Sequence, residues 1–331
     1  MDSMHATVVV PGSLVPAELA VELAASLVAP AMSRLLARSS VASESAAEPG
    51  LADTTWFAQS VYGEPPPPPT APYAWAALAG AHDAEAQIWH ADPVHVAIGR
   101  DSLIVLELTD APDEAEANAL MAAANECLLT AGLTLRRIGA HWFLHADRDW
   151  TMTPRPLAAA LGLPLPAAAP DDGDTLRWSR LHNEIQMRWH VHAINAAREA
   201  QGRPVVNALW LHGGGKWRAR PALRWPRVRS GRADLQGLAH AAGAAIEVSG
   251  TALTGDTLLV WDDAAAPARG SDWPRWLAAM QAIDQRLATL PPSATLELVM
   301  TGLRRIRVRT THPSDRYRVW RRTSLAQALT E

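Results

Sequence analysis

The densest set of polar side chains in the sequence lies between residues 182 and 198. We predict one long helix over residues 175–200, and at roughly 100° per residue it would gather five of them within about a third of its circumference. These five are Glu184, Arg188, His192, Asn195 and Arg198. An acid, two guanidiniums, an imidazole and an amide on one stripe could bind an anion or relay a proton. The alternative interpretation is an ion-paired, solvated helix face or a seam between domains.

A run of three glycines is the second feature that could do chemistry. Gly213–Gly215 follow a strand predicted over residues 205–211, and consecutive glycines let backbone N–H groups approach an anion. The run does not fit a P-loop, because Lys216 is followed by Trp217 rather than by a hydroxyl residue, and it does not fit the Rossmann glycine spacing either. We expect a flexible loop that shapes the mouth of a pocket, with anion binding as the alternative.

Residues for metal-dependent or nucleophilic chemistry are sparse. Glu184 and His192 lie two turns apart, unlike the ligands of an H-E-x-x-H zinc helix. Cys127 is the single cysteine, so the sequence predicts neither a disulfide framework nor a cysteine-based zinc site. No G-x-S-x-G elbow occurs, and Ser13 is the one serine at a predicted strand-to-helix turn. We therefore expect no metal and no cofactor.

The net charge of −4 and the isoelectric point near 6.3 disfavour a nucleic-acid partner, because such proteins usually carry a strong basic excess. The C-terminal segment from Arg304 to Arg322 is an exception, since it holds eight arginines that acids hardly oppose. Binding of nucleic acid or of an acidic partner is one interpretation of this tail. Its arginines alternate with Ile306, Val308 and Val319, which favours an exposed strand face instead.

The elements that must position these residues fall into three segments. Residues 1–90 are expected to form a strand (7–10), a helix (17–37), a loop (39–53) and a stiff linker at Pro65–Pro69. Residues 91–150 predict a small α+β subdomain. Its parts are a hairpin of strands 94–98 and 103–108, a helix over 111–131 capped by Asp110 and ended by Gly132, and strands 133–138 and 141–145.

Residues 170–331 alternate predicted strands and helices. The helices are expected over 175–200, 233–242 and 272–290, and the strands over 205–211, 244–248, 257–261, 295–300, 304–309 and 316–320. Such alternation is typical of an α/β domain, here a mixed, mostly parallel sheet flanked by helices.

The sequence predicts a cytoplasmic protein. No basic and apolar signal segment opens it, and the apolar stretch 14–36 is interrupted by prolines and charged residues, so we expect no membrane span. A single cysteine fits a reducing compartment.

Four segments of the sequence resemble the RpfE-type regulatory family of plant-associated bacteria. They are Asp92–Val96, the strand expected over Asp101–Leu108, Leu181–Met187 followed by His192, Asn195 and Arg198, and Pro204–Gly215. Homologues are often described as phosphoglycerate mutases, because the strand and glycine segment looks like part of the archaeal-type cofactor-independent enzymes. Those enzymes need two divalent metals and a nucleophile after the first strand. This sequence has no aspartate just before Ser13 and no Asp-His dipeptide, so it departs from that pattern.

Taken together, these residues predict a non-catalytic regulatory or binding protein with a degenerate phosphomutase-like α/β domain. Its partner would be an anionic small molecule or a protein, and not a membrane or a nucleic acid. The expected ligand-binding residues are Glu184, His192, Asn195, Arg198, Asn207, Trp210, His212, Gly213 and Gly215. The alternatives are a mutase or phosphatase-like enzyme with His192 or His212 as general base, and nucleic-acid binding through the arginine-rich tail.

Overall fold

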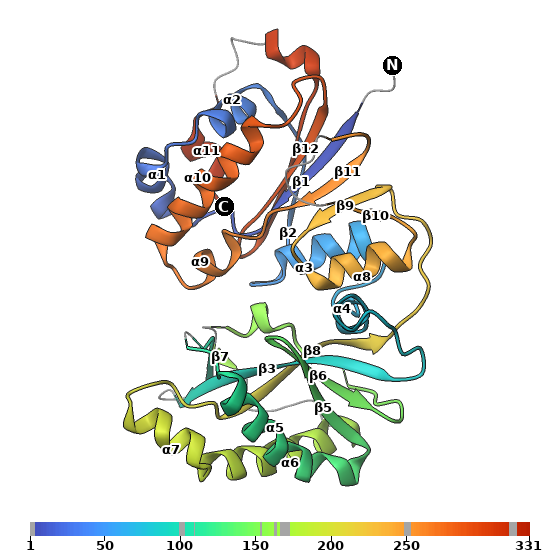
Figure 1. The fold of residues 1–331 in the computed structure, drawn as a ribbon. Coiled ribbons are helices and arrows are strands. Elements are labelled where there is room, and N and C mark those ends of the chain that lie inside the picture. The colour runs from blue at the N-terminus through green and yellow to red at the C-terminus, as the bar shows by residue number, and fades with distance from the viewer. Residues whose placement is uncertain are drawn as a thin grey trace. The chain divides into compact units, whose positions relative to one another are not determined.

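The chain divides into two compact units, Met1–Pro66 with Ala219–Glu331 (unit 1) and Pro67–Arg218 (unit 2). The computed structural model describes residues 4–98, 103–108, 110–152, 154–161, 164–165, 173–247, 253–317 and 323–331 (Figure 1). These units differ from the three segments expected from the sequence. Unit 1 brings the two ends of the chain together, and unit 2 joins the expected subdomain over 91–150 to the segment that ends at Arg218.

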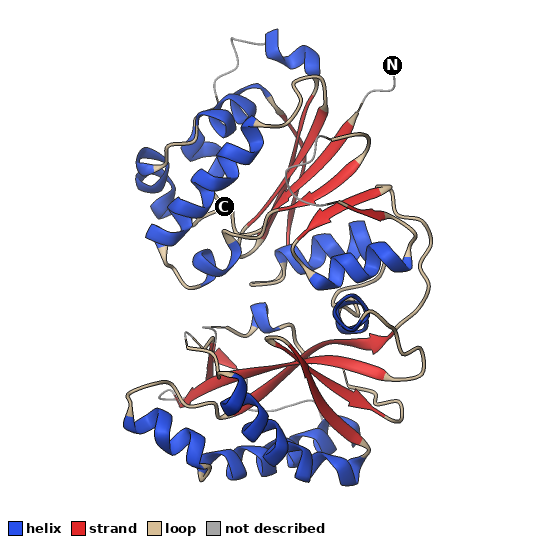
Figure 2. Ribbon diagram, viewed as in Figure 1, coloured by secondary structure: helices blue, strands red, loops and turns tan. Residues whose placement is uncertain are grey.

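Unit 1 is built on a seven-stranded sheet in the order β10-β9-β11-β1-β12-β13-β2 (Figure 2). Its strands are β1 (His5–Val10), β2 (Ser40–Ala46), β9 (Arg227–Ser230), β10 (Ala245–Ile246), β11 (Thr257–Val260), β12 (Thr295–Thr301) and β13 (Arg305–Thr311). The five strands from β10 to β12 are parallel, and β13 and β2 are antiparallel to their neighbours. The predicted fold class, a mixed and mostly parallel sheet flanked by helices, is confirmed for this unit.

Helices cover both faces of that sheet (Figure 1). One face carries α1 (Ala17–Ser26), α2 (Pro30–Arg38), α10 (Trp273–Ala288) and α11 (Leu325–Leu329), and the other carries α3 (Ala52–Phe57) and α8 (Ala233–Ala241). A short helix, α9 (Ala265–Arg269), precedes α10. Apolar side chains of β1, among them Val8 and Val10, pack with Met32 of α2 and with Trp276 and Met280 of α10. These side chains form the core between the sheet and the helices on that face. Alternate residues of a strand face one side, which is why these valines meet the helices together.

Two predictions for the N-terminal region are wrong. The helix expected over 17–37 is two helices, because the backbone is extended at Leu27 and Pro30 opens a new first turn, a position that suits its fixed φ. The loop expected over 39–53 contains strand β2, which pairs with β13. The composition of this stretch, rich in serine and alanine, is typical of a loop. Its backbone N–H and C=O groups are instead hydrogen-bonded to β13.

The arginine-rich strand β13 is only partly an exposed face. The side chains of Arg307 and Arg309 are buried, and both bind carbonyls near helix ends. Arg309 donates to the Ser39 hydroxyl over 2.7 Å and to the Leu36 carbonyl over 3.0 Å, and Arg307 donates to the Ala328 carbonyl over 2.9 Å. The last carbonyls of a helix lack intrahelical donors, and guanidiniums supply them here. The predicted exposed face is therefore wrong for these two residues.

Only part of the predicted last strand can be compared with the structure. The residues numbered 318–320 in the strand expected over 316–320 lie outside the described residues. The preceding Pro313–Tyr317 form a 3-10 turn.

Unit 2 is an antiparallel sheet with helices packed on it. Its strands are β3 (Gln87–Ile98), β4 (Leu103–Leu106), β5 (Leu133–Ile138), β6 (His141–Ala146), β7 (Pro164–Leu165) and β8 (Ala208–Lys216). The order is β5-β6-β3-β4-β7, and β8 pairs with β3. Its helices are α4 (Ala71–Ala79), α5 (Glu114–Leu128), α6 (Gly173–His190) and α7 (Ala193–Ala200). Trp89 and Leu144 of the sheet pack with Leu120 of α5 and Trp189 of α6 in one apolar core.

Local signals explain how α5 begins and ends. Asp113 caps its first turn by accepting from the Glu116 N–H over 2.9 Å, and Glu116 accepts from the Asp113 N–H over 3.1 Å, which together form a capping box. The predicted cap at Asp110 is wrong, because this reciprocal pair begins the helix three residues later. Gly132, with φ of 71°, ends the helical segment as predicted.

Within the described residues, none of the helices combines the length and the apolar character needed to cross a lipid bilayer.

Candidate functional site

The predicted polar stripe over residues 184–198 does not form one surface. The helix expected over 175–200 is broken, and His192 caps the new helix α7 by accepting from the Ile194 N–H at its Nδ1 over 3.2 Å. Glu184 on α6 is exposed, whereas Asn195 and Arg198 on α7 are buried. The backbone is extended at His192, so the 100° periodicity that aligned these residues does not continue across the break.

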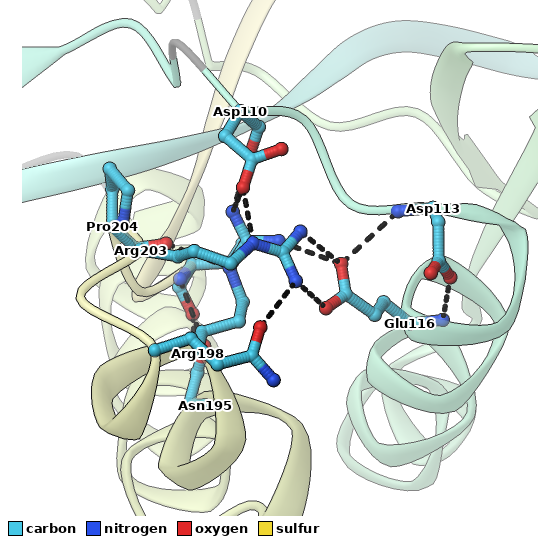
Figure 3. A network of polar contacts seen from close by, with 9 residues as sticks. Asp110, Asp113, Glu116, Asn195, Arg198, Arg203 and Pro204 are labelled. Atoms are coloured by element: carbon cyan, nitrogen blue, oxygen red, sulfur yellow. Dashed lines mark hydrogen bonds and ion pairs between the residues drawn. The ribbon is translucent and has the colours of Figure 1, made fainter.

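Arg198 lies in a buried network rather than in a pocket (Figure 3). Its Nε donates to the Pro204 carbonyl over 2.8 Å, its Nη1 to Glu116 over 2.7 Å, and its Nη2 to the Asp110 carbonyl. Arg203 adds a second guanidinium to the same carboxylate, with Nη1 2.9 Å from Glu116 Oε1. All three nitrogens of Arg198 are thus bound by protein oxygens, and the network ties α7 to the start of α5.

Two asparagines of the predicted site act as backbone partners. Asn195 donates to the carbonyls of Trp189 and Val206, each over 2.8 Å, and accepts from the Val206 N–H over 2.9 Å. Asn207 accepts from the Val96 N–H over 2.7 Å and donates to the Val96 carbonyl over 2.9 Å. Each amide carries a donor and an acceptor, as a peptide group does, and uses both on backbone atoms of the protein.

The glycine run lies in a strand, and the predicted loop is wrong. Gly213, Gly214 and Gly215 belong to β8, which pairs with β3. A Cβ on Gly214 would overlap the indole of Trp89, and one on Gly215 would lie 2.6 Å from the Cβ of Pro69. Neighbouring side chains occupy the space that a side chain here would need, which explains the absence of Cβ atoms without a bound anion.

His212, also on β8, lies beside other ionisable side chains. Its Nε2 lies 2.7 Å from Oδ2 of Asp92 on β3, and its ring stacks on that of His90 with the centroids 4.7 Å apart. His90 and His212 are direct partners in the β3–β8 register, and Asp92 is two residues along the same face. We call His90, Asp92 and His212 the imidazole cluster.

The surroundings of the imidazole cluster favour an ionised aspartate. Burial disfavours the charged form of Asp92, but the hydrogen bond from His212 and the nearby imidazoles of His212, His90 and His141 outweigh it, so the pKa of this carboxyl lies below its ordinary value. Both Asp92 and His212 are half-buried. A carboxylate bonded to Nε2 fixes the ring orientation of His212 and leaves Nδ1 to act as a base or as a donor.

Aromatic side chains surround the cluster on the same unit. The ring of Phe143 on β6 lies 5.3 Å from that of His90 and 6.4 Å from that of His141. Trp210, a predicted site residue, donates from Nε1 to the Arg155 carbonyl over 2.8 Å and so fixes the segment beside β8. The structure therefore brings Trp210 and His212 to one strand. It places Glu184 on α6, Asn195 and Arg198 on α7, and His192 at the cap between these helices.

Ser13 follows β1, where the nucleophile of the resembled enzymes would stand. Its hydroxyl is fully buried and donates to the Val10 carbonyl over 2.6 Å. Gly12 packs so closely on α9 that a Cβ there would lie 2.8 Å from the Ala264 carbonyl oxygen, and Trp276 donates to the Gly12 carbonyl over 2.8 Å. Neighbouring atoms fill the space around this serine.

Neither the imidazole cluster nor the turn at Ser13 is arranged as a metal site. Among the described residues, no group of three or more His, Cys, Asp or Glu side chains is arranged to hold a metal ion.

Sequence reasoning missed Asp92 and His90 as site residues. Asp92 opens a motif that carried the resemblance, and His90 lies two residues before it, a spacing that places both on one face of a strand. The strand was expected only over 94–98, so this shared face was not predicted. What the sequence did not show is that β8 would pair with β3 and place His212 opposite His90.

Comparisons with known proteins show a similar fold and indicate no activity. No protein-family model matches the chain, and no curated protein matches it. The PH0037 protein from Pyrococcus horikoshii has a similar structure, with a TM-score of 0.52 and 12% identity over 94% of this chain and 88% of that one. A cofactor-independent phosphoglycerate mutase from Thermoplasma acidophilum has a TM-score of 0.41 and 15% identity, over 93% and 90% of the two chains. We base the shared fold on the first comparison and draw nothing from the second.

Proposed function

We propose that the protein is a non-catalytic binding protein that recognises an anionic small molecule at the imidazole cluster and acts as a regulator. The observation that carries this proposal is the arrangement of His212, with Nε2 on Asp92 and its ring stacked on His90. The resemblance to RpfE-type proteins supports the regulatory role. The degenerate phosphomutase-like character of the α/β domain belongs to the same proposal.

The imidazole cluster has the chemistry that anion recognition needs. A protonated His212 donates one N–H to Asp92 and offers a second N–H at Nδ1 to a ligand oxygen, and His90 lies beside it as a second imidazole. Charge-assisted hydrogen bonds from such groups to phosphate or carboxylate oxygens are stronger than neutral ones.

The packing around Ser13 supports the non-catalytic part of the proposal. A nucleophile must reach the reacting atom with its oxygen, but the Ser13 hydroxyl has no exposed surface and is bonded to Val10. Releasing it would require α9 and Trp276 to move away from the turn at Gly12.

A second candidate function is a mutase or phosphatase-like enzyme that uses His212 as general base. The 2.7 Å contact between His212 and Asp92 favours it, because a carboxylate that orients an imidazole is a recurrent device of general-base catalysis. His192, the other predicted base, uses its Nδ1 to cap α7 and is a weaker choice.

The two functions are separated by binding and turnover measured on the same preparation. Inorganic phosphate and 3-phosphoglycerate are titrated while the melting temperature is followed, since a ligand that binds only the folded state raises it. We expect a rise that His212→Asn abolishes and that His190→Asn, at an exposed position on α6, leaves unchanged. Unchanged melting of the parent protein with both ligands would refute anion binding.

The turnover arm uses 3-phosphoglycerate with Mg²⁺ or Mn²⁺. We expect no product. Turnover that disappears in His212→Asn and persists in Ser13→Ala would establish the general-base enzyme in place of the binding protein.

A further inference from the structure

The sheet face that holds the imidazole cluster continues along β8 to Trp210. Trp210 lies two residues before His212, so both side chains are on the same face of the strand, with their Cα atoms about 7 Å apart. In the β3–β8 register, Trp210 is the direct partner of Asp92, and His212 is the direct partner of His90. The indole is therefore the next side chain along this face from the imidazoles.

The contact between His212 and Asp92 runs diagonally across the two strands. His212 Nε2 lies 2.7 Å from a carboxylate that stands opposite Trp210 rather than opposite His212 itself. This contact joins the pair of His90 and His212 to the pair of Asp92 and Trp210. Diagonal neighbours in a sheet are within reach of aromatic side chains. A ligand held by the imidazole cluster therefore has the indole within reach of its other groups.

The indole of Trp210 is fixed and only half-buried. Its Nε1 donates to the Arg155 carbonyl over 2.8 Å. Because this N–H is used within the protein, the indole offers a ligand only its apolar ring. The hydrogen bond also restricts the rotation of the ring before a ligand arrives, which lowers the conformational entropy that binding costs.

Beyond Trp210 the same face becomes apolar. The next pair in the register is Val94 and Ala208, and both side chains are buried. Trp210 packs against the small apolar cluster that these two residues form with Val105 and Ala160. The face thus changes from imidazoles to an indole and then to aliphatic side chains. A polar site bounded on one side by an apolar surface fits a ligand with an anionic end and an apolar body.

We propose that the ligand of the imidazole cluster is a phosphate monoester that carries a planar ring, with its phosphate at His212 and His90 and its ring against Trp210. This inference rests on the proposed anion site and adds the class of ligand to it. A phosphate offers several oxygens to two imidazole donors. A planar ring is favoured over an aliphatic group because an indole stacks on other π systems, including nucleobases.

The test is calorimetric titration of the full chain near pH 7 with a series of phosphates. The series consists of inorganic phosphate, cyclohexyl phosphate, 1-naphthyl phosphate and adenosine 5′-monophosphate, and 1-naphthol supplies the ring without the anion. We expect at least one of the two planar-ring phosphates to bind about fivefold or more tightly than cyclohexyl phosphate, the lower end of what one aromatic stacking contact contributes. The tighter of the two shows whether the ring is bonded directly to the phosphate or lies at the distance found in a nucleotide.

Substitution of the indole provides a second measurement. Trp210→Leu should remove the preference for a planar ring and leave the binding of inorganic phosphate in place, and Trp210→Phe, which keeps a ring, should retain part of the preference. Trp178→Leu is the matched control in the same unit. Trp178 is also half-buried, but it packs in the core that contains Leu209 and Leu211, which face away from Trp210 on β8.

The results separate this inference from the proposed function. Inorganic or cyclohexyl phosphate that binds as tightly as the planar-ring phosphates would overturn the inference and leave the anion site standing. The same holds for a preference that Trp210→Leu reduces no more than Trp178→Leu does, and for 1-naphthol that binds as tightly as 1-naphthyl phosphate. Absence of binding for every phosphate would refute the anion site itself, and the inference with it.

Discussion

Arg198 and Glu116 form an ion pair of 2.7 Å between α7 and α5, and the guanidinium has no exposed surface. Glu116 also accepts from Arg203 and from the Asp113 N–H that opens α5. One carboxylate therefore serves as a helix cap and as the acceptor of two guanidiniums. This sharing makes the loop after α7 and the start of α5 depend on each other.

Arg198→Ala should destabilise the protein by about 1–3 kcal/mol, because it leaves the Pro204 carbonyl without its donor and removes one of the donors to the Glu116 carboxylate. Arg305→Ala is the control, since Arg305 makes an exposed pair with Glu44, and exposed pairs contribute less than about 1 kcal/mol. Urea unfolding followed by circular dichroism measures both. Equal effects of the two substitutions would contradict the structural role of Arg198.

Gly214→Ala should destabilise unit 2 by about 1–3 kcal/mol or more, since the new methyl group overlaps the buried indole of Trp89. Gly173→Ala is a matched control in the same unit, because a Cβ at Gly173 meets open space. Thermal unfolding compares the two. If the glycines instead served an anion, Gly214→Ala would reduce the effect of phosphate on the melting temperature and leave the ligand-free stability intact.

Acidification should destabilise the protein between about pH 6.5 and pH 4. Burial lowers the pKa of His182 and of His145 from 6.5 to about 4 in the folded state. In this window the unfolded chain binds more protons than the folded one, so stability decreases as the pH falls. His182 accepts from the Leu209 N–H over 3.2 Å, and protonation of that nitrogen removes the acceptor.

His182→Gln tests this origin, because glutamine can accept a hydrogen bond and does not titrate. The urea midpoint of the variant should fall less steeply between pH 6.5 and 4 than that of the parent, by the contribution of about one proton. Identical slopes in the two proteins would show that His182 does not take up a proton on unfolding.

Anion binding at the imidazole cluster should be accompanied by proton uptake. A bound anion favours the protonated form of imidazoles beside it, and the rings of His90 and His212 lie with their centroids 4.7 Å apart. Calorimetric titration with inorganic phosphate near pH 7, in two buffers of different ionisation enthalpy, measures the protons taken up. We expect up to one proton, and fewer in His90→Gln. Phosphate binding with the same heat in both buffers would exclude this coupling.

The elements of unit 1 could be predicted well from local signals, and the long-range pairings could not. Helix α10 was expected over 272–290, and strands β1 and β12 were expected within a residue or two of their bounds, because apolar periodicity and caps are local. Strand β2 was missed, since Ser40–Ala46 owe their extended form to hydrogen bonds with β13. The amino-acid composition of a segment does not indicate pairing with a strand so distant in the sequence.

The candidate site was predicted in part for the same reason. His212 and Trp210 were named from the sequence, and they lie on the strand that forms the imidazole cluster. Asn195 and Arg198 were named as ligand-binding residues because polar side chains on one stripe look available. The structure instead uses them for backbone carbonyls and Glu116, a role that periodicity cannot separate from an exposed one.

The interrupted path of unit 1 has a consequence for how the protein is made. Ala6 of β1 pairs with Thr257, and Val8 pairs with Leu298. The strand β1 can therefore pair with its neighbours only after almost the entire chain has left the ribosome. Unit 2 is continuous and can fold as soon as its last residue is available. Its own close contact between Pro69 and Gly215 then draws the two arms of unit 1 together, which shortens the search that β1 has to make.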